Sequence, residues 1–213
     1  MDKYIIEFIG TYFLMLAICM SVLGGLGTFA PIAIGMTLIG VIYMGGHISS
    51  AHYNPAVTLA FILCKKIHKS DILGYLVAQI SAAFLATITA SFLLENHSSV
   101  IDVSMLDLSQ NIFPSLLAEF LGTFVLCLVI LNVAIAKGTA GNSFYGIAIG
   151  FTVIGIAYAF GGISGGAFNP AVAIGISMAE MVRWNDIWIF LVANFAGGAV
   201  AAFVFQLTAD MKE

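Results

Sequence analysis

Two boxes of identical sequence, Asn-Pro-Ala-Val, are the residues of this chain whose types and spacing best predict chemistry. Each follows a Gly- and Ser-containing stretch and precedes an apolar run. Asparagine is a favoured helix N-cap and proline a favoured first helical residue, so each box predicts a loop entering a new helix. An asparagine amide placed there can also donate a hydrogen bond to a passing oxygen. The predicted site residues are Asn54, Pro55, Ala56, Asn169, Pro170 and Ala171.

The helix after the first box has room for only half of a membrane. Charges at Lys65 and Lys66 end the apolar run that starts at Asn54. About ten helical residues span roughly 15 Å, half of a hydrocarbon core of about 30 Å. Non-helical backbone at that depth is tolerated only where protein covers it or water lines it. Two re-entrant elements of this kind therefore predict a water-lined path through the membrane.

Composition assigns the chain to integral membrane proteins. Apolar residues make up 61% and charged residues 8%, whereas soluble domains carry about 25% charged residues. No basic face for nucleic acid exists, and the apolar N-terminus lacks a signal-peptide pattern, so it is expected to remain as the first span. Three scattered cysteines predict neither a disulfide framework nor a metal site. Without a nucleophile–base set, we expect no enzyme and no cofactor.

Six full spans can be placed in a single channel domain, 1–213. They are expected at 4–23, 31–45, 72–94, 114–135, 144–160 and 187–207. Six of the seven Lys and Arg residues then fall on one side, and only Arg183 falls on the other. The positive-inside rule therefore predicts a multi-pass protein of the cell membrane with both termini cytoplasmic.

The two halves of the chain, approximately 1–110 and 111–213, are copies. Fifteen of the 26 residues from 32 to 57 are identical to the residue 115 positions later. Each half holds three spans, and because three is odd the second copy enters from the opposite side. The predicted fold is an all-α membrane protein with six transmembrane helices and two re-entrant half-helices in an inverted repeat. Inverted repeats place their shared site near the midplane.

The two half-helices are expected to meet at Asn54 and Asn169. Each helix N-terminus carries roughly +0.5 of a charge, so the two ends together oppose any cation in a narrow path. A water molecule that is held by both asparagine donors cannot easily pass a proton along a single file of water molecules. The arrangement predicts passage of water without charge.

At these residues the sequence resembles the major intrinsic protein family, the aquaporins and glycerol facilitators. The paired boxes, the six spans and the Glu-x-x-Gly-Thr openings at Glu7 and Glu119 extend the resemblance over essentially the whole chain. The resemblance implies a homotetramer in the lipid bilayer with one pore per protomer. The expected cargo is water and small neutral solutes.

One departure from that family concerns the outer constriction. An arginine usually follows the second box, and here the position is Val172. Water-selective members typically have Phe and His at positions 34 and 157, and glycerol facilitators commonly have Asp at position 173, where this chain has alanine. An atypical, wide and apolar filter is therefore expected. Carried over by spacing, it consists of Ile34, Ala157, Gly166 and Val172.

Three further side chains have predicted roles near the boxes. Glu7 and Glu119 occupy matched positions in apolar spans, where carboxylates are costly. We expect them to accept hydrogen bonds from backbone N–H groups of the re-entrant loops, with a proton relay as the alternative. His47 is expected to order its loop or line the cytoplasmic vestibule, with a pH gate as the alternative. His47 and His52 flank the first box, and no third ligand is evident that would complete a metal site with them.

The favoured function is a passive channel for water and glycerol-like solutes. A strict water channel is the first alternative. A weakly ion-conducting channel or transporter is the second, and it would need charged rings or buried coupling groups. Only Glu7 and Glu119 qualify, and both have the structural explanation given above.

Overall fold

The computed structural model describes residues 1–95 and 105–209 and is built from helices. Asp102, an acidic residue of the connection expected between the third and fourth spans, and the basic residue Lys212 lie outside the described residues. The α-helices are α1 (Asp2–Leu23), α2 (Ala30–Ser49), α3 (Pro55–Leu63), α4 (Ile72–Leu94), α5 (Ile112–Ala134), α6 (Tyr145–Ser164), α7 (Pro170–Met178) and α8 (Ile187–Ala209). Short 3-10 turns connect several of them.

Six helices in the described part of the chain are long and apolar enough to cross a bilayer, which confirms the six predicted spans. Two of these helices run four residues further than expected. α2 continues to Ser49, and α6 continues to Ser164. The backbone that follows explains both ends. Ser50 (φ 67°) and Gly165 (φ 90°) adopt the left-handed conformation that commonly terminates helices. Their N–H groups bond to the carbonyls of residues 46 and 161.

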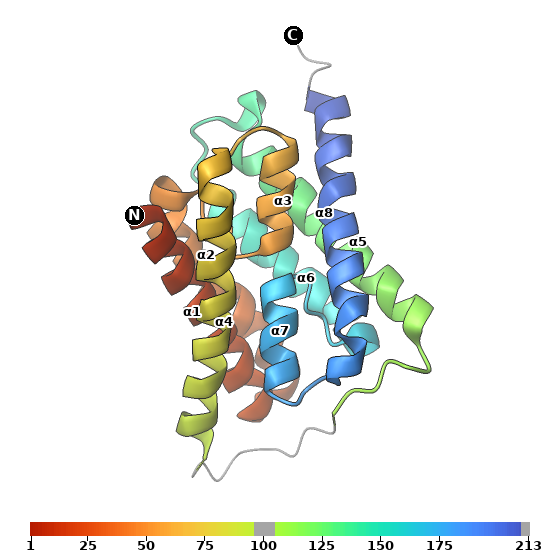
Figure 1. Ribbon diagram of the computed structural model, residues 1–213. Coiled ribbons are helices and arrows are strands. Elements are labelled where there is room, and N and C mark those ends of the chain that lie inside the picture. Colours follow the sequence, from red (N-terminus) through yellow and green to blue (C-terminus); the bar gives the residue numbers. More distant parts are fainter. Residues whose placement is uncertain (96–104, 210–213) are drawn as a thin grey trace.

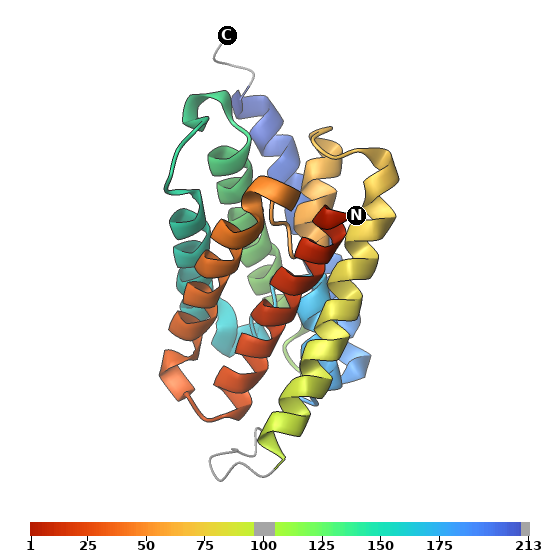
Figure 2. The ribbon, with the colours of Figure 1, turned by 90° about the vertical axis from the view of Figure 1, so that its left-hand side faces the viewer.

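The packing of the helices repeats between the two halves. α1 packs along α2 and α4, and α5 packs in the same way along α6 and α8. Figure 2 shows α1 lying between α2 and α4. α2 and α6 cross where Gly35 and Gly150 meet, since a Cβ on either glycine would lie 2.7 Å from the other's carbonyl oxygen. Close crossing of small residues is a common basis of helix association in lipid.

The two nine-residue helices α3 and α7 enter the bundle from opposite ends and meet in its middle (Figure 1). α3 packs mainly on α8, and α7 packs mainly on α4. Each half-helix is therefore held by the last helix of the other half. This exchange makes the interior of the bundle a joint product of both copies.

The segment after the undescribed residues closes over the α7 end of the bundle. Leu106 donates its N–H to the Met181 carbonyl at 2.8 Å and accepts from the Arg183 N–H at 3.3 Å. Asp186 accepts from the N–H of Leu108 at 2.9 Å. The side chain of Leu106 lies close to Gly165. These contacts fix the loop after α6 and the start of α8 to each other.

We predict that Gly165→Ala lowers the thermal unfolding midpoint, whereas Gly155→Ala does not. At φ 90° an added Cβ is strained and meets Leu106, and a left-handed residue other than glycine costs about 1–2 kcal/mol. Gly155 lies within α6 with open space beside it. Thermal unfolding in detergent checks the pair. Equal midpoints for the two variants would contradict the proposed cause.

Candidate functional site

Each half-helix begins at the asparagine of its box. Asn54 and Asn169 have extended backbones (φ −158° and −160°), and proline follows each as the first helical residue. The Asn54 side-chain oxygen accepts from the N–H of Ala56 at 2.8 Å, and that of Asn169 accepts from Ala171 at 2.9 Å. N-cap bonds of this type satisfy a backbone donor that the helix itself leaves unpaired.

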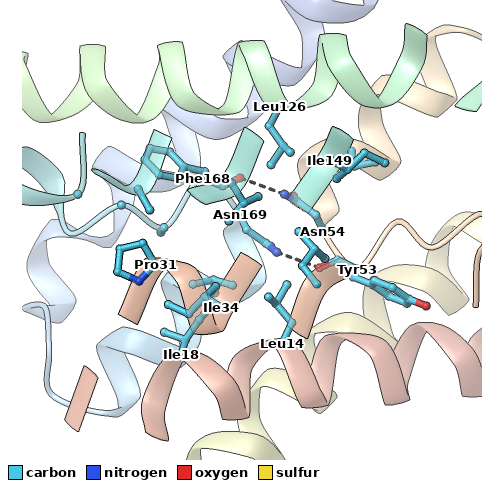
Figure 3. Close-up of a pocket in the computed structure, with 18 of the residues that line it drawn as sticks. Leu14, Ile18, Pro31, Ile34, Tyr53, Asn54, Leu126, Ile149, Phe168 and Asn169 are labelled. Carbon is cyan, nitrogen blue, oxygen red and sulfur yellow. Dashed lines mark hydrogen bonds between the residues drawn. The ribbon is translucent and has the colours of Figure 1, made fainter. Parts of the chain in front are cut away.

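The two asparagines also reach across to the opposite loop (Figure 3). The Asn54 amide donates to the carbonyl of Phe168 at 3.0 Å, and the Asn169 amide donates to the carbonyl of Tyr53 at 2.9 Å. Each carbonyl belongs to the residue just before the other asparagine. The exchange ties the two half-helix starts together and aligns both amides side by side at the centre.

Glu7 is fully buried and supports the first loop. One carboxylate oxygen accepts from the Ser49 hydroxyl at 2.7 Å and the His52 N–H at 2.9 Å. The other accepts from the Tyr53 N–H at 2.7 Å and the Gln79 amide at 2.9 Å. Four donors converge on one acceptor group, which is the pattern that an ionised carboxylate can satisfy.

Glu119 makes the same arrangement in the second half and is also fully buried. Its donors are the Ser164 hydroxyl at 2.6 Å, the N–H groups of Ala167 and Phe168 at 2.9 and 2.7 Å, and the Asn194 amide at 2.8 Å. Both carboxylates therefore sit where the sequence placed them, beneath the re-entrant loops. The groups before the boxes that they bind lie one to five residues before the asparagine.

A cavity of about 260 Å³ surrounds the asparagine pair. Figure 3 shows Leu14 and Ile34 on one side of the pair and Leu126 on the other. The polar residues that line this cavity include His52, Asn54 and Asn169. Among its apolar lining residues are Leu14, Ile18, Leu38, Leu126, Val153 and Ile176.

The four residues predicted for the outer constriction all line this cavity. Ile34, Ala157 and Gly166 are half-buried, while Val172 is 3% exposed. Gly166 has φ 68°, a left-handed backbone conformation for which glycine is suited. Four residues that come from α2, α6, the second loop and α7 therefore line one cavity, as their spacing predicts.

A second cavity of about 300 Å³ lies toward the α3 end of the bundle. His47 lines it and is exposed, together with Tyr145 and the loop residues Thr139 and Asn142. Across the described parts of the chain, no Asp, Glu, Lys or Arg lines either cavity. Nor do the described residues hold a group of three His, Cys, Asp or Glu suited to a metal ion.

An ion pair lies at the α7 end of the bundle. Arg183 lies 2.6 Å from Asp107, and both side chains are partly exposed. Hydrogen bonds from Ser109 are the main cause that lowers the pKa of Asp107, and the charge of Arg183 acts in the same direction. Exposed pairs of this kind contribute little to stability.

Sequence reasoning missed several partners of the predicted site residues. Ser49 and Ser164 bind the carboxylates, and they are identical residues 115 positions apart, so the repeat could have identified them. Gln79 and Asn194 keep the same spacing but differ in type. The acceptor carbonyls of Tyr53 and Phe168 leave no signal in residue type, since any residue carries one.

We predict that Glu7→Gln lowers the thermal unfolding midpoint less than Glu7→Leu. Glutamine retains one acceptor oxygen, whereas leucine leaves the His52 and Tyr53 N–H groups unpaired at about 1–3 kcal/mol each. Thermal unfolding of purified protein in detergent measures the difference, with Ile5→Leu on the exposed face of α1 as the control. Equal midpoints and equal yields for both Glu7 variants would remove the supporting role.

Comparison with known proteins agrees with this architecture. The chain is 34% identical to probable aquaporin NIP4-2 of Arabidopsis thaliana over 96% of its length and 74% of that protein. It is 34% identical to aquaporin AqpM of Methanothermobacter thermautotrophicus, covering 96% of each. It is 33% identical to glycerol uptake facilitator protein-like 6 of Lactiplantibacillus plantarum, covering 95% of this chain and 96% of that protein.

The fold matches a solved structure as well. The X-ray structure of the aquaglyceroporin from Plasmodium falciparum superposes with a TM-score of 0.84 at 22% identity, covering 97% of this chain and 96% of that one. The family model described as major intrinsic protein matches residues 1–205. With its six spans, two half-helices and reciprocal asparagine contacts, the chain belongs to the major intrinsic protein family.

Proposed function

We propose that the chain is a passive channel for water and small uncharged, glycerol-like solutes. The carrying observation is the asparagine pair at the centre of a cavity whose walls are otherwise largely apolar. The similarity to aquaporins and to a glycerol facilitator-like protein supports this cargo. A strict water channel remains the alternative that the experiment below separates.

Asn54 and Asn169 act as the central donors of the proposed pore. A side-chain amide carries two N–H groups, and in each asparagine one N–H is engaged by the opposite carbonyl. The remaining N–H of each is available to a solute oxygen. Because the side-chain oxygens are held by the caps, the amides cannot reverse and present an acceptor.

The two half-helices supply electrostatic repulsion of cations at the same point. α3 and α7 both begin at the cavity centre, and each N-terminus carries roughly +0.5 of a charge. No acidic side chain from the described residues lines the cavity to offset these charges. The absence of charged rings among these lining residues favours the channel for neutral solutes over an ion channel or ion-coupled transporter.

The outer constriction formed by Ile34, Ala157, Gly166 and Val172 is proposed to be wide and apolar. Alanine and glycine leave room for solutes larger than water, and the half-burial of three of the residues supports an open region there. An apolar ring offers few hydrogen bonds, and an uncompensated hydroxyl costs about 2–7 kcal/mol to desolvate. Backbone carbonyls of the 165–168 loop can compensate, so we expect the steric gain to dominate.

The assembly and orientation are further parts of the proposal. We infer a homotetramer in the cell membrane, as membership of the family favours, with both termini cytoplasmic. The five described lysines follow the rule of positive cytoplasmic loops, since they flank the N-terminus, the end of α3 and the end of α5. Arg183 precedes α8 at the opposite end. His47 would then line the cytoplasmic vestibule.

We predict that Val172→Arg reduces glycerol flux more than water flux. Arginine narrows the constriction and adds a charge, while Val172→Leu, the control, adds volume alone. Stopped-flow light scattering of proteoliposomes under glycerol and sorbitol gradients measures both fluxes. We expect wild-type vesicles to shrink and then re-swell in glycerol faster than protein-free vesicles.

Two results would count against this reading of the filter. Wild-type vesicles that pass water quickly but re-swell in glycerol no faster than protein-free vesicles would indicate a strict water channel. An equal loss of glycerol and water flux in Val172→Arg would show that position 172 does not discriminate between them. Conductance of wild-type protein in planar bilayers would support the ion-channel alternative.

The topology makes a separate prediction. A protease site fused after the C-terminus should be cleaved in inside-out vesicles and protected in right-side-out vesicles, because the basic residues retain that side in the cytoplasm. A tag inserted in the 135–144 connection should behave identically. Cleavage from the outside alone would reverse the proposed orientation while leaving the fold intact.

A further inference from the structure

The two cavities meet at four residues that line both of them. These shared residues are Ile42, Ala51, Ile130 and Ile149. Their side chains carry no polar atom, and they are 3%, 9%, 6% and 6% exposed. The central cavity therefore adjoins the second cavity at a junction of buried apolar side chains.

This junction and the predicted outer constriction occupy equivalent positions in the two copies of the internal repeat. The shift of 115 residues that superimposes the two boxes also relates three of the four shared residues to the predicted outer filter. The pairs, with the inner residue first, are Ile149 with Ile34, Ile42 with Ala157, and Ala51 with Gly166. Both constrictions thus occupy equivalent places on equivalent backbones.

The inner copy has the larger side chains at two of these three places. Ile42 stands where the outer filter has alanine, and Ala51 stands where it has glycine. The burial agrees, because the inner residues are buried while Ile34, Ala157 and Gly166 are half-buried. Since the backbone framework is shared, the difference in side-chain volume makes the inner constriction the narrower of the two.

We propose that Ile42, Ile130 and Ile149, closed by Ala51, form an inner apolar neck that excludes protons and other ions from the pore. The inference rests on the proposed channel function and adds a second specificity-determining constriction to it. With Val172 in place of a filter arginine, the outer constriction contributes no charge. The neck supplies a barrier of a different physical kind, based on dehydration.

The neck opposes the passage of ions because its side chains offer no hydrogen-bonding or charged groups. The four side chains of the neck give an ion no side-chain ligand to replace its hydration shell, and narrow apolar rings impede conduction by losing water. Transfer of a charge into apolar surroundings costs far more than transfer of a neutral polar group. Water crosses a short neck singly and regains partners at the asparagines on one side. A proton requires an unbroken hydrogen-bonded file, which the neck interrupts.

The test places a polar group in the neck while the substituted side chain keeps its four heavy atoms. Ile149→Asn introduces an amide, and Ile149→Leu is the matched control of similar shape. Purified full-length variants are reconstituted in proteoliposomes containing a pH-sensitive dye, with potassium and valinomycin to clamp the potential. Proton flux after a pH jump and water flux under a sorbitol gradient are measured on the same vesicles.

We expect wild type and Ile149→Leu to leak protons no faster than protein-free vesicles. Ile149→Asn should leak at least about tenfold faster while it retains water flux, which corresponds to about 1.4 kcal/mol of barrier. Ile130→Asn and Ile130→Leu repeat the comparison on α5 and decide the matter if Ile149→Asn fails to fold.

The outcomes separate the neck from the channel function. An asparagine variant that conducts water and is as proton-tight as its leucine control would overturn the neck and leave the channel intact. A wild type that leaks protons as fast as Ile149→Asn would also overturn the neck. Wild-type vesicles without water flux would overturn the channel function itself.

Discussion

Two buried carboxylates make it possible for this chain to keep irregular backbone in the interior of a membrane protein. Backbone N–H groups there have no water to bond, and each unpaired group is costly. Glu7 and Glu119 each collect four donors, two of them from the loop that precedes an asparagine box. With the loops held from behind, the asparagines are presented at the centre of the bundle. The cavity and its donors depend on this support.

The internal repeat extends that single solution to both halves and then allows the halves to differ. The asparagines, the carboxylates and the capping bonds are matched at a spacing close to 115 residues. The constrictions on either side of them share the backbone but have different side chains, with Ala157 on one side and Ile42 on the other. A symmetric framework thus carries different side chains at its two ends, which is the basis of our proposal that the outer constriction is wider than the inner one.

Much of the architecture was predictable because it depends on local and periodic features. Apolar runs of sufficient length identified the six spans, and the Asn-Pro pairs identified both half-helix starts. The helix ends were less predictable. α2 and α6 run on through Gly46–Ser49 and Gly161–Ser164, because Ser49 and Ser164 find partners on distant carboxylates. The expected spans end before Gly46 and Gly161, where the Gly- and Ser-containing stretches begin, but a buried partner permits the helix to continue.

The sequence by itself determined the class of the protein, the inverted repeat and the identity of the central asparagines, because these follow from residue types at fixed spacing. Only the tertiary structure decided which groups bind those residues. The acceptors Tyr53 and Phe168 act through backbone carbonyls, which residue type does not encode. The shared lining of the two cavities likewise depends on four separate elements converging, α2, the first loop, α5 and α6. Packing in three dimensions brings Ile42, Ile130 and Ile149 to one point, and no spacing along the chain specifies that distance.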